Sequence, residues 1–312
     1  MLSIRRLVVL LGTSSLACVH AGKTGEGGAS PGAVALRFAW PEDYRSHVFV
    51  VHESRRSGTE PTGLVARQRL VAERKGDEIW VSTHEIAARG TEPDLEAIVK
   101  INQALVQVVS PDGRFRRAEG LDQALSAMKI GSAAEGAVAR EALTRSAASD
   151  WELVVGAWAG QTLDVDQVRH KQAKGGVPLL LSAETLLDVE YGLEGRVPCT
   201  AEDTARNCVQ LSYRSRLAPE DRAATVERVR RLNPSKPNEA VPEDVHAELE
   251  ALLITEPGTL VPHQLTQRER LRIRMRLPDG HVQEVEERSE EVSVFGERQP
   301  GAPEQENTPQ GL

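Results

Sequence analysis

Alternating apolar and polar residues mark the first part of the chain as β-structure. Side chains along a strand point to opposite faces in turn, so this alternation predicts strands with one buried face. Turn residues such as Lys75-Gly76-Asp77 separate the alternating runs, which indicates an antiparallel meander. The predicted strands are residues 33–40, 43–54, 62–75 and 77–86.

The spacing changes to that of helices in the middle of the chain. In residues 92–105 the apolar residues recur at helical intervals and form one side: Leu95, Ile98, Val99, Ile101 and Leu105. A hairpin around Pro111-Asp112-Gly113 follows, and then helices over residues 120–130, 132–148 and 150–158. In the last helix Trp151, Val154, Val155 and Trp158 lie on one face, which indicates core rather than a sugar-binding platform.

Strands return in the second half. We predict them over residues 161–172, 178–195 and 208–217, and helices over 219–232 and 242–254. Both of these helices begin with Pro-Glu-Asp, which suits a first helical turn because the N–H that Pro lacks is not needed there and acids favour the positive end of the helix dipole. The whole pattern predicts an α+β fold with a predominantly antiparallel, curved sheet and clustered helices.

The last predicted hairpin carries arginine at every second position from 268 to 276. Pro278-Asp279-Gly280 forms its turn, and a register that keeps Ile273 opposite Val285 sets arginines against glutamates. The pairs are Arg274 with Glu284, Arg272 with Glu286 and Arg268 with Glu290. Arg270 then faces Arg288, a repulsion that diagonal glutamates can relieve. We therefore interpret the arginine row as a structural charge ladder on a solvated face and not as a phosphate-binding strand.

The N-terminus has the layout of a signal for export. Arg5 and Arg6 precede a short apolar run, residues 7–11, which is too short to span a bilayer. Ser15-Leu16-Ala17-Cys18 then resembles the lipobox of exported bacterial lipoproteins, which implies cleavage after residue 17 and a lipid on Cys18. Cleavage after Ala21, giving a soluble periplasmic or secreted protein, is the alternative.

The resemblance to bacterial lipoproteins also suggests a location. Val19 follows the lipid-bearing position, where some inner-membrane lipoproteins have Asp, so the resemblance implies anchoring in the outer membrane on the periplasmic side. In gross layout the chain is similar to lipoproteins with curved antiparallel sheets, including LolA/LolB-like carriers that hold lipid in a concave sheet. This is an architectural analogy, and a fold does not by itself imply a function.

Cysteine usage agrees with an oxidising compartment. If Cys18 is lipidated, Cys199 and Cys208 remain as an even pair around a polar loop, and we predict a disulfide between them. Such a bridge contributes about 2.5–3 kcal/mol in the chain-entropy model. Two free thiols are the alternative. A zinc site is disfavoured because no second Cys or His pair with ligand spacing is nearby.

Composition limits the domain plan and the partners. We expect a signal peptide over residues 1–17, a flexible Gly-rich tether over 18–32, a body over 33–295 and a disordered tail over 296–312. One domain is favoured for the body, with a split near 131–158 as the alternative. The net charge of −8 becomes −10 once Arg5 and Arg6 are removed, which disfavours nucleic acid as a partner.

Several fragments imitate catalytic motifs and fail at a specific residue. The Gly-Lys-Thr at 22–24 lacks the first glycine of a phosphate loop because position 17 is Ala. His84-Glu85 begins like a zinc helix, but Ala88 stands where the second His ligand must be. Asp164, Asp166 and His170 share one face of a predicted strand, which is also the pattern of a solvated face. We therefore predict no catalytic residue, metal or cofactor.

Two functions remain. The favoured one is a lipid-anchored cell-envelope protein that binds or scaffolds, with the membrane as a partner through Cys18 and an envelope protein or apolar ligand as the other. The alternative is a periplasmic or secreted hydrolase with dispersed carboxylates. It requires a polar cleft with a carboxyl of raised pKa, for instance near Asp164, Asp166 or Glu190.

Overall fold

The computed structural model describes residues 32–128, 130, 132–176, 184–200, 208–232 and 240–296. The predicted signal peptide, Cys18, nearly all of the tether and the tail from residue 297 lie outside the described residues. No helix among those described is both long enough and apolar enough to cross a membrane.

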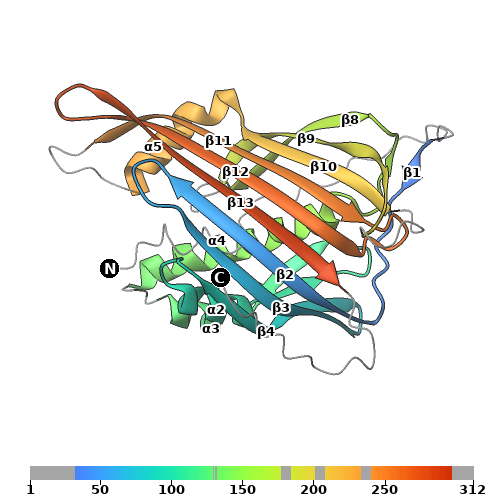
Figure 1. The fold of residues 1–312 in the computed structure, drawn as a ribbon. Coiled ribbons are helices and arrows are strands. Elements are labelled where there is room, and N and C mark those ends of the chain that lie inside the picture. Colours follow the sequence, from blue (N-terminus) through green and yellow to red (C-terminus); the bar gives the residue numbers. More distant parts are fainter. Residues whose placement is uncertain are drawn as a thin grey trace, which may run out of the picture.

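Two antiparallel meanders make one large sheet (Figure 1). The first consists of β2 (Asp43–Arg56), β3 (Thr62–Lys75), β4 (Glu78–Gly90), β5 (Val106–Val109) and β6 (Phe115–Glu119). The second consists of β8 (Val168–Gly176), β9 (Glu184–Val197), β10 (Cys208–Leu217), β11 (Val241–Thr255), β12 (Pro262–Arg276) and β13 (Val282–Gly296). The first and last long strands, β2 and β13, pair antiparallel and join the meanders into an 11-stranded sheet.

The sheet is open, with β6 at one edge and β8 at the other. Strand β13 is therefore the central strand, flanked by β12 and β2. A second small sheet pairs β1 (Val34–Ala35) with β7 (Thr162–Leu163). The structure confirms the α+β class and the predominance of antiparallel sheet. We expected a curved sheet. The sheet stays open, and no backbone hydrogen bonds pair β6 with β8 among the described residues.

Helices α2 (Leu95–Ala104), α3 (Leu121–Ala127) and α4 (Ala133–Trp151) gather on one side of the sheet (Figure 1). Ser132 caps α4, since its hydroxyl accepts from the backbone N–H of Glu135. A π-helical segment, Glu152–Gly156, continues α4. Helix α5 (Arg222–Leu232) packs against β11. The face of the sheet toward α2 and α4 is called the inner face below.

Apolar side chains of the inner face form the core. The largest cluster joins the second meander to the segment after α4, where Trp151, Val155 and Trp158 are almost fully buried. This confirms the interpretation of that segment as core. A smaller cluster connects β2 and β3 to α2 through residues such as Val48, Leu64 and Ile98. The largest cluster also includes Tyr44 of β2, Ala72 of β3 and Val81 of β4, so the core extends across the central strand.

The helix predicted for residues 242–254 is wrong. This segment lies in β11, between β10 and β12. Its inward side chains alternate along the strand and are buried: Val245, Ala247, Leu249, Ala251 and Leu253. The Pro-Glu-Asp start suits a helix, but here it falls at a register shift near Pro242. Burial of the alternating residues in a large sheet outweighs the local helix signal.

Two predicted strands are shorter than expected. Of residues 33–40 only Val34–Ala35 are strand, and residues 161–172 are interrupted between β7 and β8. Asp166 in this interruption has φ of 61°, which belongs to a turn rather than a strand. The face that Asp164, Asp166 and His170 were expected to share therefore does not exist.

Candidate ligand-binding cavity

The inner face of the central strand is polar, although its surroundings are apolar. Residues that point inward along β13 are Glu287, Ser289, Glu291 and Ser293, which we call the β13 polar row. The outward-facing residues between them include Arg288 and Glu290, which are exposed. A central strand that served packing alone would present aliphatic residues inward, because buried polar groups need compensating partners.

Neighbouring strands extend the β13 polar row sideways. Glu291 lies opposite Gln267 of β12 and His52 of β2, while Ser289 lies opposite Glu269 and Ser54. Gln267 and Glu269 are each 6 % exposed. The Ser289 hydroxyl donates to Glu269 at 3.5 Å, and the Ser293 hydroxyl donates to Glu291 at 3.3 Å. Three adjacent strands thus bring polar groups together inside the molecule.

His52 of β2 is a buried histidine beside the β13 polar row. Its side chain is 4 % exposed, and its Nδ1 lies 3.7 Å from the Glu291 carboxylate. That distance is too long for a hydrogen bond, and neither ring nitrogen has a hydrogen-bond partner among the described residues. A buried imidazole without such partners is uncommon in a folded protein and indicates a site that a ligand or water completes.

A cavity of about 220 Å³ opens between the sheet and helices α2 and α4. Most of its wall is apolar and comes from β2, β3, α2 and two tryptophans, with Val48, Val50, Leu64, Ala66, Ile98, Trp40 and Trp151 as examples. Its polar wall includes Glu291 and Ser293 of the β13 polar row, Gln267 of β12 and Ser146 of α4. A largely apolar cavity with a few convergent polar groups is the usual form of a small-molecule site.

The size of the cavity restricts its contents. A dry apolar cavity of about 150 Å³ accommodates one benzene molecule, and drug-sized ligands occupy pockets of about 300–1,000 Å³. At about 220 Å³ the cavity fits a molecule slightly larger than benzene.

Burial changes the acidity of one carboxyl in the β13 polar row. The pKa of Glu287 is raised mainly by burial, with the neighbouring Glu92 adding to the effect and Arg56 opposing it. Arg56 faces Glu287 directly across the β2–β13 pair. The inner face therefore holds a carboxyl that resists ionisation.

Sequence reasoning missed this site, but a signal for it exists. In residues 286–291, Glu-Glu-Arg-Ser-Glu-Glu, neither the odd nor the even positions are apolar. A half-buried strand normally has apolar residues at every second position, on its buried face. Of the inward glutamates in this stretch, Glu291 lines the cavity.

The arginine row has the predicted register. Arg274 lies opposite Glu284, Arg272 opposite Glu286 and Arg268 opposite Glu290. The ion pairs differ from this register, however. Arg268 binds Glu290 at 2.9 Å, whereas Glu286 binds Arg270 and Arg288, and Arg272 has no ion pair with any described residue.

Glu286 thus relieves the one repulsive pair of the hairpin, Arg270 opposite Arg288. Arg274 and Arg276 form ion pairs with Glu243 of β11 and not with a glutamate of β13. Arg268 borders a groove on the outer face together with Glu250, but it is paired with Glu290, so the groove is not a free cationic surface.

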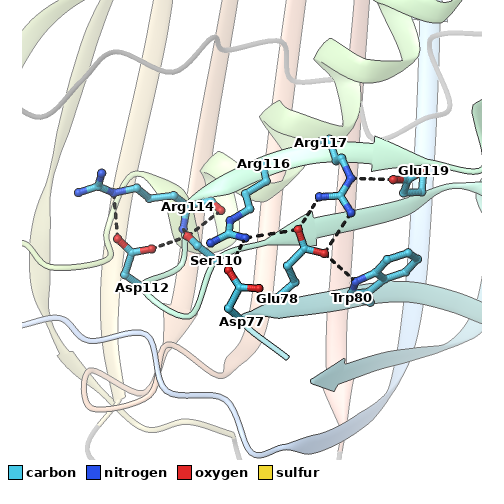
Figure 2. A network of polar contacts seen from close by, with 9 residues as sticks. All are labelled: Asp77, Glu78, Trp80, Ser110, Asp112, Arg114, Arg116, Arg117 and Glu119. Atoms are coloured by element: carbon cyan, nitrogen blue, oxygen red, sulfur yellow. Dashed lines mark hydrogen bonds and ion pairs between the residues drawn. The ribbon is translucent and has the colours of Figure 1, made fainter. Parts of the chain in front are cut away.

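A second polar network ties the edge strand β6 to β4, on either side of β5 (Figure 2). Glu78 accepts two hydrogen bonds from Arg117, at 2.5 and 3.0 Å, and others from Arg116 and Trp80 at 3.3 Å. Hydrogen bonding to Arg117 is the main cause that lowers the pKa of Glu78 to about 2. Every group here is satisfied by another, which indicates a structural role at the sheet edge.

The disulfide prediction is confirmed. Cys199 and Cys208 are bonded, and the bridge stands at the start of β10. His263 of β12 lies within 4.8 Å of both sulfurs, which adds one histidine and not a second pair of ligands. Since thiolates and not disulfides bind zinc, the bridge leaves His263 to its contact with Glu256 at 3.2 Å.

The carboxylates suggested for a hydrolase do not converge. Asp164 and Asp166 lie between β7 and β8, and Glu190 faces outward, where it binds Arg216 at 2.7 Å. Glu152 at the end of α4 is a buried carboxyl whose pKa is raised by burial, but Lys171 lies 3.7 Å away. None of these four borders the cavity.

Comparisons with known proteins add little. No family model matches the chain, and no curated protein matches it. A solved structure titled "Lipid-protein interactions in lipovitellin" matches the chain with 11 % identity and a TM-score of 0.39. The match covers 88 % of this chain and 26 % of the lipovitellin chain, so this chain spans about a quarter of that protein. A likeness of this strength says nothing about what the present chain binds.

Proposed function

We propose that this protein binds a small, largely apolar ligand in the cavity between β2, β13, α2 and α4. The observation that carries the proposal is the polar row on the inner face of the central strand, next to an apolar cavity of about 220 Å³. Neither feature is needed for packing. Together they supply what a small-molecule site requires, apolar area for affinity and polar groups for orientation.

The three carboxylates named from the sequence for a hydrolase do not support that alternative. The carboxylates expected to act in a hydrolase, Asp164, Asp166 and Glu190, lie away from the cavity. A purely scaffolding protein has no use for an internal cavity, which costs stability because its lining loses packing contacts. Binding of a ligand offsets that cost.

Two adjacent alanines of β4 provide a matched test. Ala88 borders the cavity, and Ala87 is exposed on the opposite face of the same strand. Ala88→Phe fills the cavity, so we expect it to weaken binding of a probe such as 2-phenylethanol by at least tenfold. Ala87→Phe leaves the cavity open and should bind as wild type does. Calorimetry measures the affinity, and the emission of Trp40 and Trp151 in the cavity wall reports occupancy.

The test has a clear negative outcome. If the wild-type protein binds no small apolar probe, or if both phenylalanine variants bind the probe equally well, the cavity is not a ligand site. Thermal unfolding of both variants shows whether each is folded.

We also propose that the protein works in the cell envelope, anchored through Cys18. The support is the signal-like N-terminus with its lipobox-like Ser15–Cys18, together with the Cys199–Cys208 disulfide, which suits an oxidising compartment. Palmitate labelling and membrane fractionation of wild type and Cys18→Ala test it. Label and membrane association should both be lost in the variant, and an unlabelled, cytosolic wild type would overturn the proposal.

A further inference from the structure

The ionisable side chains in the wall of the cavity are acidic. Glu291 of β13 and Asp150 of α4 line it, and no Lys, Arg or His among the described residues does. The Ser293 hydroxyl donates to Glu291, and Nδ1 of His52 lies 3.7 Å from the same carboxylate. A ligand group that fits here should therefore donate hydrogen bonds and carry no negative charge.

His52 is a second, independent indication of a ligand. It shares the inner face with Val48 and Val50, which line the cavity, and its neighbours across the two adjacent strands, Glu291 and Leu64, line it too. The side chain is 4 % exposed and has no hydrogen bond from either ring nitrogen to a described residue. His52 itself lies beside this wall and is not part of it, and a buried imidazole without such partners is a group that a ligand or water completes.

Charge distinguishes between possible head groups. Along the β13 polar row the ionisable residues are Glu287 and Glu291, with Glu269 beside them on β12. Arg56 faces Glu287 at the far end of the row, two inward positions from Glu291. An anionic head placed next to Glu291 would add like charge in a poorly solvated site, whereas a cationic head would pair with it.

From this arrangement we infer that the ligand is a small amine with an apolar body. Its ammonium group donates to the Glu291 carboxylate, and its apolar part lies among residues such as Val50, Ile98 and Trp151. An ammonium carries three donors and a positive charge, which suits a carboxylate acceptor. This inference rests on the proposed function, since it names the class of ligand for the same cavity.

Three probes with one phenyl ring and different heads test the inference: 2-phenylethylamine, 2-phenylethanol and 3-phenylpropanoate. Calorimetry with the full-length protein should show the amine binding at least tenfold more tightly than the alcohol, and the carboxylate binding most weakly. Glu291→Gln keeps the shape of the side chain and removes its charge. In this variant the preference for the amine should disappear, while affinity for the alcohol stays within about twofold.

Glu290→Gln is the matched control, because Glu290 is the adjacent residue on the outer face of the same strand. It should retain the preference for the amine. If the alcohol binds but the amine binds no better, or if Glu290→Gln abolishes the preference as Glu291→Gln does, the inference is wrong and the proposed function stands. If none of the three probes binds the wild-type protein, the proposed function fails and the inference fails with it.

Discussion

The pKa values of two glutamates in this sheet are shifted in opposite directions by their surroundings. Glu78 accepts hydrogen bonds from Arg116, Arg117 and Trp80 at the sheet edge (Figure 2), and its pKa falls to about 2. Glu287 stands on the inner face, and burial raises its pKa. The edge favours the charged form of the group, and the interior favours the neutral form.

These opposite shifts give opposite pH dependences of stability. Glu287 has a folded-state pKa above its unfolded value, so its ionisation opposes folding as pH rises through the folded pKa. Glu287→Gln mimics the neutral form and should therefore increase the free energy of unfolding at pH 7, by about 1.4 kcal/mol for each unit by which the pKa is raised. The gain should vanish below about pH 4. Urea unfolding across this pH range measures it.

Glu78→Gln is the control of opposite sign. The stabilisation from Glu78 is present above its unfolded pKa of about 4.5 and is lost as pH falls toward about 2. The variant should be less stable than wild type at pH 7 and converge with it in acid. A Glu287→Gln variant that is destabilised at pH 7 would show that its carboxylate is needed in the ionised form.

At the scale of elements, charges on the outer face alternate strand by strand. Arg214 of β10 binds Glu248 and Glu250 of β11, and Arg268 of β12 binds Glu290 of β13. Each arginine strand thus lies between two acidic ones. Cross-strand pairing accounts for the arginine row without any external anion.

Glu286 should be the most valuable member of the charge ladder. It binds both Arg270 and Arg288, which face each other across β12 and β13. Glu286→Gln removes two ion pairs and leaves that repulsion unrelieved, so we expect a loss of about 1 kcal/mol at low salt, shrinking as salt increases. Chemical denaturation at two ionic strengths measures the loss.

Glu284→Gln provides the comparison within the same strand. Glu284 lies opposite Arg274 but has no ion pair with any described residue, because Arg274 contacts Glu243. Its replacement should change stability by no more than a few tenths of a kcal/mol. Equal losses in the two variants would mean that register, and not the observed ion pairs, determines the energetics.

Strand β11 shows how an element can be misread from its own residues. Residues 242–254 begin like a helix, and their run of Glu, Ala and Leu has high helix propensity. The alternation of Ala247, Leu249 and Ala251 with Glu248 and Glu250 is the competing signal, and it prevails once β10 and β12 cover both edges. Local propensity is worth tenths of a kcal/mol for each residue, whereas burial of one leucine is worth about 2.

At the scale of the whole molecule, pairing of β2 with β13 is the contact that unites the sheet. The other pairs of neighbouring long strands follow one another along the chain, but β2 and β13 join residues near the two ends of the folded body. The pairing also brings the parts of the site together, because the polar row lies on β13 and His52 lies on β2. Formation of the site therefore depends on the contact that is most distant in sequence.

Removal of β13 should have a large effect for that reason. Truncation after Asp279 leaves β2 and β12 as long unpaired edges and opens the core, so we expect loss of cooperative unfolding and increased aggregation. Differential scanning calorimetry and analytical ultracentrifugation measure these properties. If the truncated chain keeps a single sharp transition as a monomer, the two meanders are independent and the contact between β2 and β13 is dispensable.

The sequence by itself determined most of the strands, the register of the last hairpin and the disulfide. These features depend on alternation, turn chemistry and the spacing of two cysteines, which act over short stretches of chain. Only the tertiary structure decided that residues 242–254 form a strand, that Glu286 bridges Arg270 and Arg288, and that His52 meets Glu291 beside a cavity. Those outcomes depend on which strands become neighbours. The pairing of β2 with β13 joins residues about 240 positions apart, and no local pattern encodes a partner at that distance.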